Sequence, residues 1–150
     1  MSNSQLFRIF RGNIAPLWLG MPDDEVRTVI GRADFEQQTA PGIDVWGYGR
    51  VELGLLDLRL ASIVINFGAS RSGREEFPDF FKELKELELP VTEKALAEQF
   101  KMNSISWREI PEDGNARVRE WITSSDPLVR IGFGVKSTNR DTVDRLTIFS

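Results

Sequence analysis

The sequence predicts an α+β fold made of two tandem repeats, each a helix packed on a small antiparallel sheet of three or four strands, with the two sheets either separate or merged into one. Three observations predict this fold. Apolar residues at helical spacing occur early in each half of the chain, short runs of alternating apolar residues follow them, and each half carries a tryptophan in a corresponding strand. These features divide the chain into a first repeat at residues 1–68, a connector with a helix at 69–88, and a second repeat at 89–150.

The first clear helix is predicted to begin at Pro22 and to end at Gly31. Val26, Val29 and Ile30 fall at positions i, i+3 and i+4, which is the spacing of one helix face. Proline fits the first turn of a helix, and the acidic residues that follow it favour a helix N-terminus. Glycine at the C′ position ends the helix.

Strands are predicted next at residues 45–48, 51–55 and 60–67, because apolar residues alternate there. A tight turn joins the first two strands in a hairpin. Residues 68–74 form the one stretch rich in glycine and serine, and it lies near the middle of the chain. We therefore expect it to connect the two halves.

The second half predicts a helix from Pro78 to about Glu88 and another that begins after Thr92 as its N-cap. The residues expected to point inward from these helices are Phe80, Phe81, Leu84, Leu87, Ala95, Leu96 and Phe100. Four strands are predicted to follow, at residues 105–110, 117–123, 128–135 and 144–149. Asparagine, aspartate and proline supply turn chemistry between them.

The two halves align in the same order of elements, which is the evidence for a repeat. The proposed matches are Leu19 with Leu89, Val26 with Leu96, Trp46 with Trp121, Leu53 with Ile131, and Ile63 and Ile65 with Leu146 and Ile148. The offset grows along the chain, as loop insertions in the second copy would make it. Strand alternation is common, so a single α+β domain without internal symmetry stays open as an alternative.

The composition restricts the chemistry that this chain can perform. It has no cysteine and no histidine, which excludes disulfides, thiolate nucleophiles, Cys/His zinc sites and Ser-His-Asp triads. Carboxylates, lysines and one tyrosine remain, and no cluster of them stands out, so we expect no enzyme, no cofactor and no metal. No signal peptide or membrane-spanning run is apparent, which predicts a cytoplasmic protein.

One string of residues resembles a known motif. It comprises Leu19 to Arg27, then Ile30-Gly31, Trp46-Gly47-Tyr48-Gly49 and Val51-Glu52-Leu53. The string resembles the L-G-M-x-x-x-E-V-R-x-x-[LI]-G … W-x-Y-G-x-[VL]-E-[LF] pattern of small bacterial proteins grouped with polymorphic-toxin immunity proteins. Its opening also resembles the helix start of the SmpA/OmlA assembly lipoproteins, and the tandem β-lactamase inhibitor proteins share the general layout. The resemblance implies a helix-then-sheet fold and a protein that binds other proteins.

Sorting the predicted strands by alternation gives a candidate binding face. One face collects aliphatic residues for the core, and the other collects aromatic and charged residues that we expect to bind a partner. The candidate binding residues are Trp46, Tyr48, Arg50, Glu52, Arg117, Arg119, Trp121, Arg130 and Arg145. The alternative is that the two tryptophans pack under loops or on each other, with solvated arginines around them.

The sequence therefore predicts a non-catalytic protein-binding module, most concretely an immunity protein that occludes a bacterial toxin. A net charge of −4 suits a basic partner. A scaffold or assembly module of the same fold is the alternative. Nucleic-acid binding is a weaker one, since bases stack on aromatic residues but the acidic charge opposes phosphate.

Overall fold

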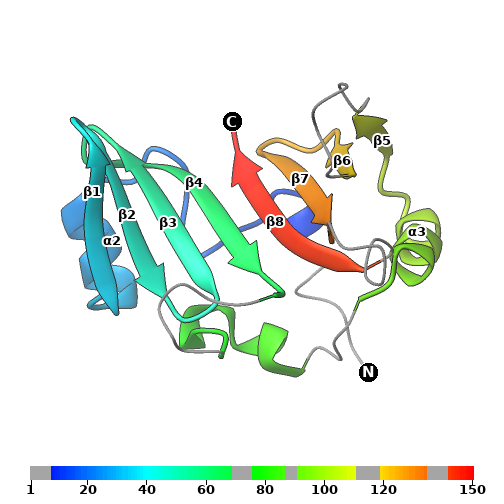
Figure 1. Ribbon diagram of the computed structural model, residues 1–150, viewed down its shortest axis with the longest axis horizontal. Coiled ribbons are helices and arrows are strands. Elements are labelled where there is room, and N and C mark those ends of the chain that lie inside the picture. The colour runs from blue at the N-terminus through cyan, green and yellow to red at the C-terminus, as the bar shows by residue number, and fades with distance from the viewer. Residues whose placement is uncertain (1–7, 69–75, 87–90, 111–118, 135–141) are drawn as a thin grey trace.

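The computed structural model describes residues 8–68, 76–86, 91–110, 119–134 and 142–150, and one continuous antiparallel sheet dominates them (Figure 1). The sheet has eight strands in the order β1-β2-β3-β4-β8-β7-β6-β5. The predicted fold class is therefore wrong. The described residues do not form tandem repeats of a helix packed on a small sheet. They are mostly one eight-stranded sheet, in which β4 pairs with β8, and their helices are few and short.

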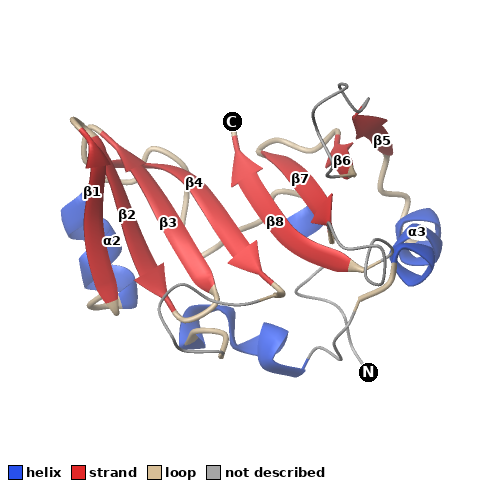
Figure 2. Cartoon of the chain, viewed as in Figure 1, coloured by secondary structure: helices blue, strands red, loops and turns tan. Residues whose placement is uncertain are grey.

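The strands and helices have these bounds. The strands are β1 Phe35–Ala40, β2 Ile43–Tyr48, β3 Val51–Leu56, β4 Arg59–Asn66, β5 Trp107–Ile110, β6 Glu120–Thr123, β7 Leu128–Phe133 and β8 Val143–Phe149. The helices are α2 Asp23–Ile30, α3 Glu93–Met102 and the 3-10 helix η1 Asp79–Glu86. In Figure 2 the helices lie behind the sheet, at its lower end or beside it, and no described helix crosses in front of the strands.

The pairing of β4 with β8 joins the two halves of the sheet. Ile63 lies opposite Ile148 and Ile65 lies opposite Leu146, and all four side chains are fully buried. Cross-strand apolar pairs of this kind stabilise a sheet through burial and mutual packing. This junction makes one core out of two sets of strands.

Helix α2 has the ends that the sequence predicts. Pro22 is its N-cap in extended conformation, and Gly31 ends it with φ of 82°, a left-handed value that glycine adopts without strain. Val26 is fully buried, whereas Val29 is exposed, so the inward face of α2 is narrower than its spacing predicts.

The predicted N-cap of α3 is confirmed, because Thr92 Oγ1 accepts a hydrogen bond from Ala95 N at 3.2 Å. Leu96 and Phe100 are buried, but Ala95 is exposed. The helix predicted after Pro78 is a 3-10 helix with a kink at Phe81. Its Phe81 and Leu84 side chains are fully buried and Phe80 partly so, while residue 87 lies outside the described part of the chain.

The N-terminal segment crosses the junction and contacts both halves. Phe10 packs edge-on against Phe100 of α3, with ring centroids 4.7 Å apart. Farther along, Gly20 N donates to Leu60 O at 2.6 Å and Leu60 N donates to Met21 O at 2.9 Å. This segment therefore lies along β4, where it forms one wall of the groove described below.

Candidate functional site

The aromatic residues predicted to bind a partner lie on the covered face of the sheet. Trp46 is opposite Leu53 and Tyr48 is opposite Val51, and residues directly opposite each other share a face. Trp121 is likewise opposite Ile131. Exposure of Trp46, Tyr48 and Trp121 is only 3%, 6% and 5%, so the structure corrects the prediction of an open aromatic face.

Trp46 is covered by helix α2 and the edge strand β1. The Arg27 guanidinium lies over the indole ring, 4.1 Å from its centroid, which is a cation–π contact. Arg27 also forms an ion pair with Glu36, the residue opposite Trp46 on β1. Tyr48 lies nearby and donates a hydrogen bond to Gly31 O at 2.9 Å, and burial raises its pKa to about 12.

Trp121 lies in an aromatic cluster instead. Its ring centroid is 5.2 Å from that of Trp107, 4.9 Å from that of Phe133 and 6.3 Å from that of Phe100. The cluster buries a large apolar area at the β5 end of the sheet. Trp107 is itself part of the edge strand, so here aromatic stacking covers the buried tryptophan.

Arg119 lies beside this cluster and is held by two carboxylates. Its guanidinium donates to both oxygens of Glu93 at 2.7 and 2.6 Å and to Glu109 at 3.0 Å. These hydrogen bonds lower the pKa of Glu93 and raise that of Arg119. A bidentate contact of this kind is geometrically specific, so Arg119, the residue before β6, cross-links this part of the chain to α3.

The remaining predicted binding residues are scattered. Arg50 lies in the β2–β3 turn and donates to Asn66 O and Gly68 O. Glu52 points to the opposite face, is nearly buried, and accepts from Asn66 Nδ2 at 3.2 Å. Arg130 and Arg145 are exposed on that opposite face, and Arg117 lies outside the described residues. The predicted residues therefore do not form one surface.

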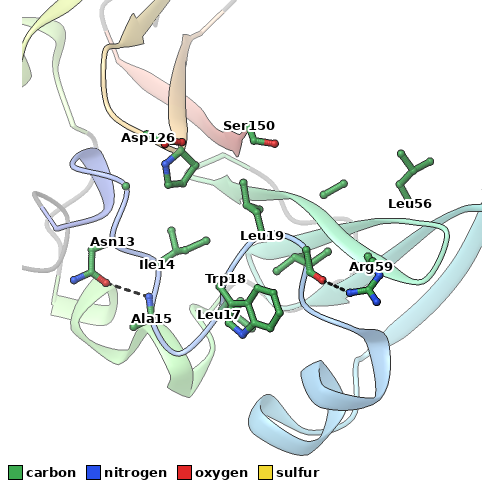
Figure 3. Close-up of a pocket in the computed structure, with 15 residues that line it drawn as sticks. Asn13, Ile14, Ala15, Leu17, Trp18, Leu19, Leu56, Arg59, Asp126 and Ser150 are labelled. Atoms are coloured by element: carbon green, nitrogen blue, oxygen red, sulfur yellow. Dashed lines mark hydrogen bonds between the residues drawn. The ribbon is translucent and has the colours of Figure 1, made fainter.

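A groove that the sequence reasoning missed lies at one end of the sheet (Figure 3). It encloses about 880 Å³ between the N-terminal segment 12–20, the β3–β4 hairpin and the turn at Asp126-Pro127. Its lining includes the buried side chains of Ile14, Leu17 and Leu60. Trp18 and Leu56 also line it, although they are 47% and 53% exposed.

The β3–β4 turn beside this groove has an unusual conformation. Asp57 and Leu58 have φ of 49° and 60°, in the left-handed region that Asn and Gly favour. A left-handed leucine costs about 1–2 kcal/mol. Leu58 is also 54% exposed, so it is apolar, solvated and strained at once.

Exposed apolar residues continue from this turn onto the neighbouring strand. Ile43 lies directly opposite Leu56 and is also exposed. We call the set of Trp18, Ile43, Leu56 and Leu58 the tip patch. Its sequence signal is the apolar run at 55–58, which continues through a turn where asparagine and glycine are typical.

Within the described ranges there is no group of three or more histidine, cysteine, aspartate or glutamate residues that could hold a metal ion. Among the same residues, no helix is long and apolar enough to cross a membrane.

The chain has little detectable similarity to known proteins. No family model matches the chain, and no curated protein matches it. Among solved structures, it is similar to a cysteine-rich secretory protein from Staphylococcus aureus subsp. aureus Mu50, with a TM-score of 0.48 and 11% sequence identity. The similarity covers 89% of this chain and 44% of that one, so this chain spans less than half of that protein's length.

Proposed function

We propose that this protein is a non-catalytic binding module that holds a partner protein at the tip patch. The observation that carries the proposal is Leu58, an exposed leucine in a strained turn. Both its exposure and its conformation oppose folding stability. Residues held in strained conformations cluster at functional sites, where the strain is retained for function.

The composition and position of the tip patch support the same proposal. Tryptophan is among the residues most enriched at the centres of protein interfaces, and Trp18 stands on the rim of an apolar groove. Contiguous exposed apolar surface marks interaction sites more often than isolated apolar residues do. Ile43 and Leu56 are cross-strand neighbours, so this part of the patch is contiguous.

We further propose that the partner is a bacterial toxin, which this protein occludes in the cytoplasm as an immunity protein. The motif from Leu19 to Leu53 that resembles immunity proteins supports this partner class. The net charge of −4 would favour association with a basic toxin, since opposite charges steer encounter.

The test compares Leu58→Asn with the wild-type protein in affinity capture from the native cell lysate. Asparagine tolerates the left-handed turn, so the free energy of unfolding should stay unchanged or rise by up to about 1 kcal/mol. Capture of the partner should fall at least about 10-fold, which corresponds to about 1.4 kcal/mol. Mass spectrometry identifies the partner, and a growth assay with the partner co-expressed tests whether it is a toxin.

Met102→Asn is the matched control, because Met102 is an apolar residue that is 76% exposed but lies outside the tip patch. It should capture the partner as well as the wild-type protein does. Equal capture by Leu58→Asn and Met102→Asn would show that the tip patch is not the binding surface. A captured partner that does not impair growth would contradict the toxin part alone.

A further inference from the structure

We infer that the groove beside the tip patch accepts a partner segment in which apolar side chains lie between an acidic and a basic residue. This inference rests on the proposed function and specifies the chemistry of the partner. It follows from three parts of the groove: an apolar lining, an arginine on one side and an aspartate on another.

The apolar lining favours a segment with several apolar side chains. Ile14, Leu17 and Leu60 are buried, while Trp18 and Leu56 present apolar surface to solvent. A volume of about 880 Å³ lies within the range of pockets that bury whole ligands, so it can hold more than one side chain. Burying such side chains against this lining supplies affinity without directional contacts.

Arg59 supplies the positive charge of the groove. Its Nη1 donates to Gly20 O at 2.9 Å, which anchors the guanidinium at the rim (Figure 3). Within the part of the chain that the structure describes, no carboxylate pairs with Arg59, whereas Arg27 and Arg119 both have such partners. The remaining N–H groups of this exposed, anchored guanidinium suit a carboxylate of the partner.

Asp126 supplies the negative charge, from the turn between β6 and β7. The backbone of Asp126 packs against Gly12, so closely that a Cβ on Gly12 would lie 2.7 Å from Asp126 O. This contact fixes the turn against the N-terminal segment. The Asp126 side chain is exposed and forms no ion pair with any described residue.

The two charges lie apart in the groove, with apolar side chains between them (Figure 3). A partner segment with reversed charges would place like charges next to each other. A segment with a single charge would leave either Arg59 or Asp126 without an oppositely charged partner. Like-charge contacts of this kind suppress wrong partners and set the orientation of the right one. The groove therefore selects the order of charges along the bound segment.

Selection from a random peptide display library tests this inference without knowledge of the natural partner. Peptides selected by the wild-type protein should carry apolar residues flanked by one acidic and one basic residue. Selection by Arg59→Glu should lose the preference for the acidic residue, and selection by Asp126→Lys should lose that for the basic one. A wild-type-selected peptide should bind each variant at least about 10-fold more weakly in fluorescence anisotropy.

Arg108→Glu is the control, because Arg108 is an exposed residue of the edge strand β5 that does not line the groove. It should select the same peptides as the wild-type protein. The inference is overturned if no peptide is enriched, or if all the proteins select the same charge pattern. Peptides that follow the predicted charges but bind Leu58→Asn at full strength would overturn the tip patch as the binding surface and leave the groove inference standing, because Leu58 does not line the groove.

Discussion

The two ends of the sheet each bury a tryptophan beneath a helix and an edge strand, but they use different contacts. At the β1 end, Trp46 lies opposite Glu36, and Arg27 of α2 covers the indole and pairs with that carboxylate. At the β5 end, Trp121 lies opposite Glu109, and the arginine that pairs with this carboxylate is Arg119, outside the helix.

The difference follows from which end of each helix supplies the contact. Arg27 is in the last turn of α2, where a cation is favourable, and Glu93 is in the first turn of α3, where an anion is favourable. The helix thus supplies a cation at one end of the sheet and an anion at the other. Where the helix supplies the anion, the tryptophan is covered by other aromatic rings instead of by a guanidinium.

The largest effect should come from removing each tryptophan in turn. Trp121→Ala should lower the free energy of unfolding by about 3–5 kcal/mol, since it empties the centre of an aromatic cluster. Trp46→Ala should cost less, because the arginine over its ring can move into the space and stay solvated. Urea unfolding monitored by circular dichroism measures both free energies of unfolding. Equal losses in the two variants would contradict the proposed difference between the two ends of the sheet.

Replacing the arginines should lower the free energy of unfolding by smaller amounts, again with the larger loss at the β5 end of the sheet. Arg119→Ala leaves Glu93 without its bidentate partner and should cost about 1–3 kcal/mol. Arg27→Ala removes a more exposed pair and a cation–π contact, and should cost about 1 kcal/mol or less. Replacement by lysine should restore more stability at Arg27 than at Arg119, because lysine cannot make the bidentate contact.

The smallest effect should appear in the acid limb of the pH dependence. The hydrogen bond from Arg119 lowers the pKa of Glu93 below its ordinary value of 4.5. The ionised Glu93 therefore contributes stability above about pH 4.5 that is lost as the pH falls through the lowered pKa. Solvent screening should keep this contribution below about 1 kcal/mol.

Thermal unfolding between acid and neutral pH should show a shallower acid limb in Glu93→Gln and in Arg119→Ala. An unchanged limb in both would show that the pair does not contribute.

Local signals in the sequence located most of the elements. Pro22 and Gly31 mark the ends of α2, and Thr92 marks the start of α3. Strand β1 was missed because residues 35–40 lack alternating apolar residues, and an edge strand needs only backbone pairing with one neighbour. The junction of β4 with β8 could not be predicted either, since local patterns identify strands but not their partners.

The candidate site was harder to predict, for two physical reasons. The two-residue turn after Tyr48 does fix the register that puts Trp46 opposite Leu53, so the burial of this tryptophan could have been inferred. The groove could not, because it forms where segments 12–20, 56–61 and 126–127 meet. The unusual turn at Leu58 could have been predicted, since leucine is rare in a two-residue hairpin turn.

The position of β8 has a consequence for how the protein reaches its folded state. It is the last of the eight strands along the chain, yet it lies at the centre of the sheet, between β4 and β7. Until β8 is in place, both of those strands have an open edge, and the contacts between β4 and β8 are distant in sequence. High contact order slows folding, and unpaired strand edges promote aggregation while it proceeds. During synthesis on the ribosome, the two halves can therefore join only after the last strand has emerged.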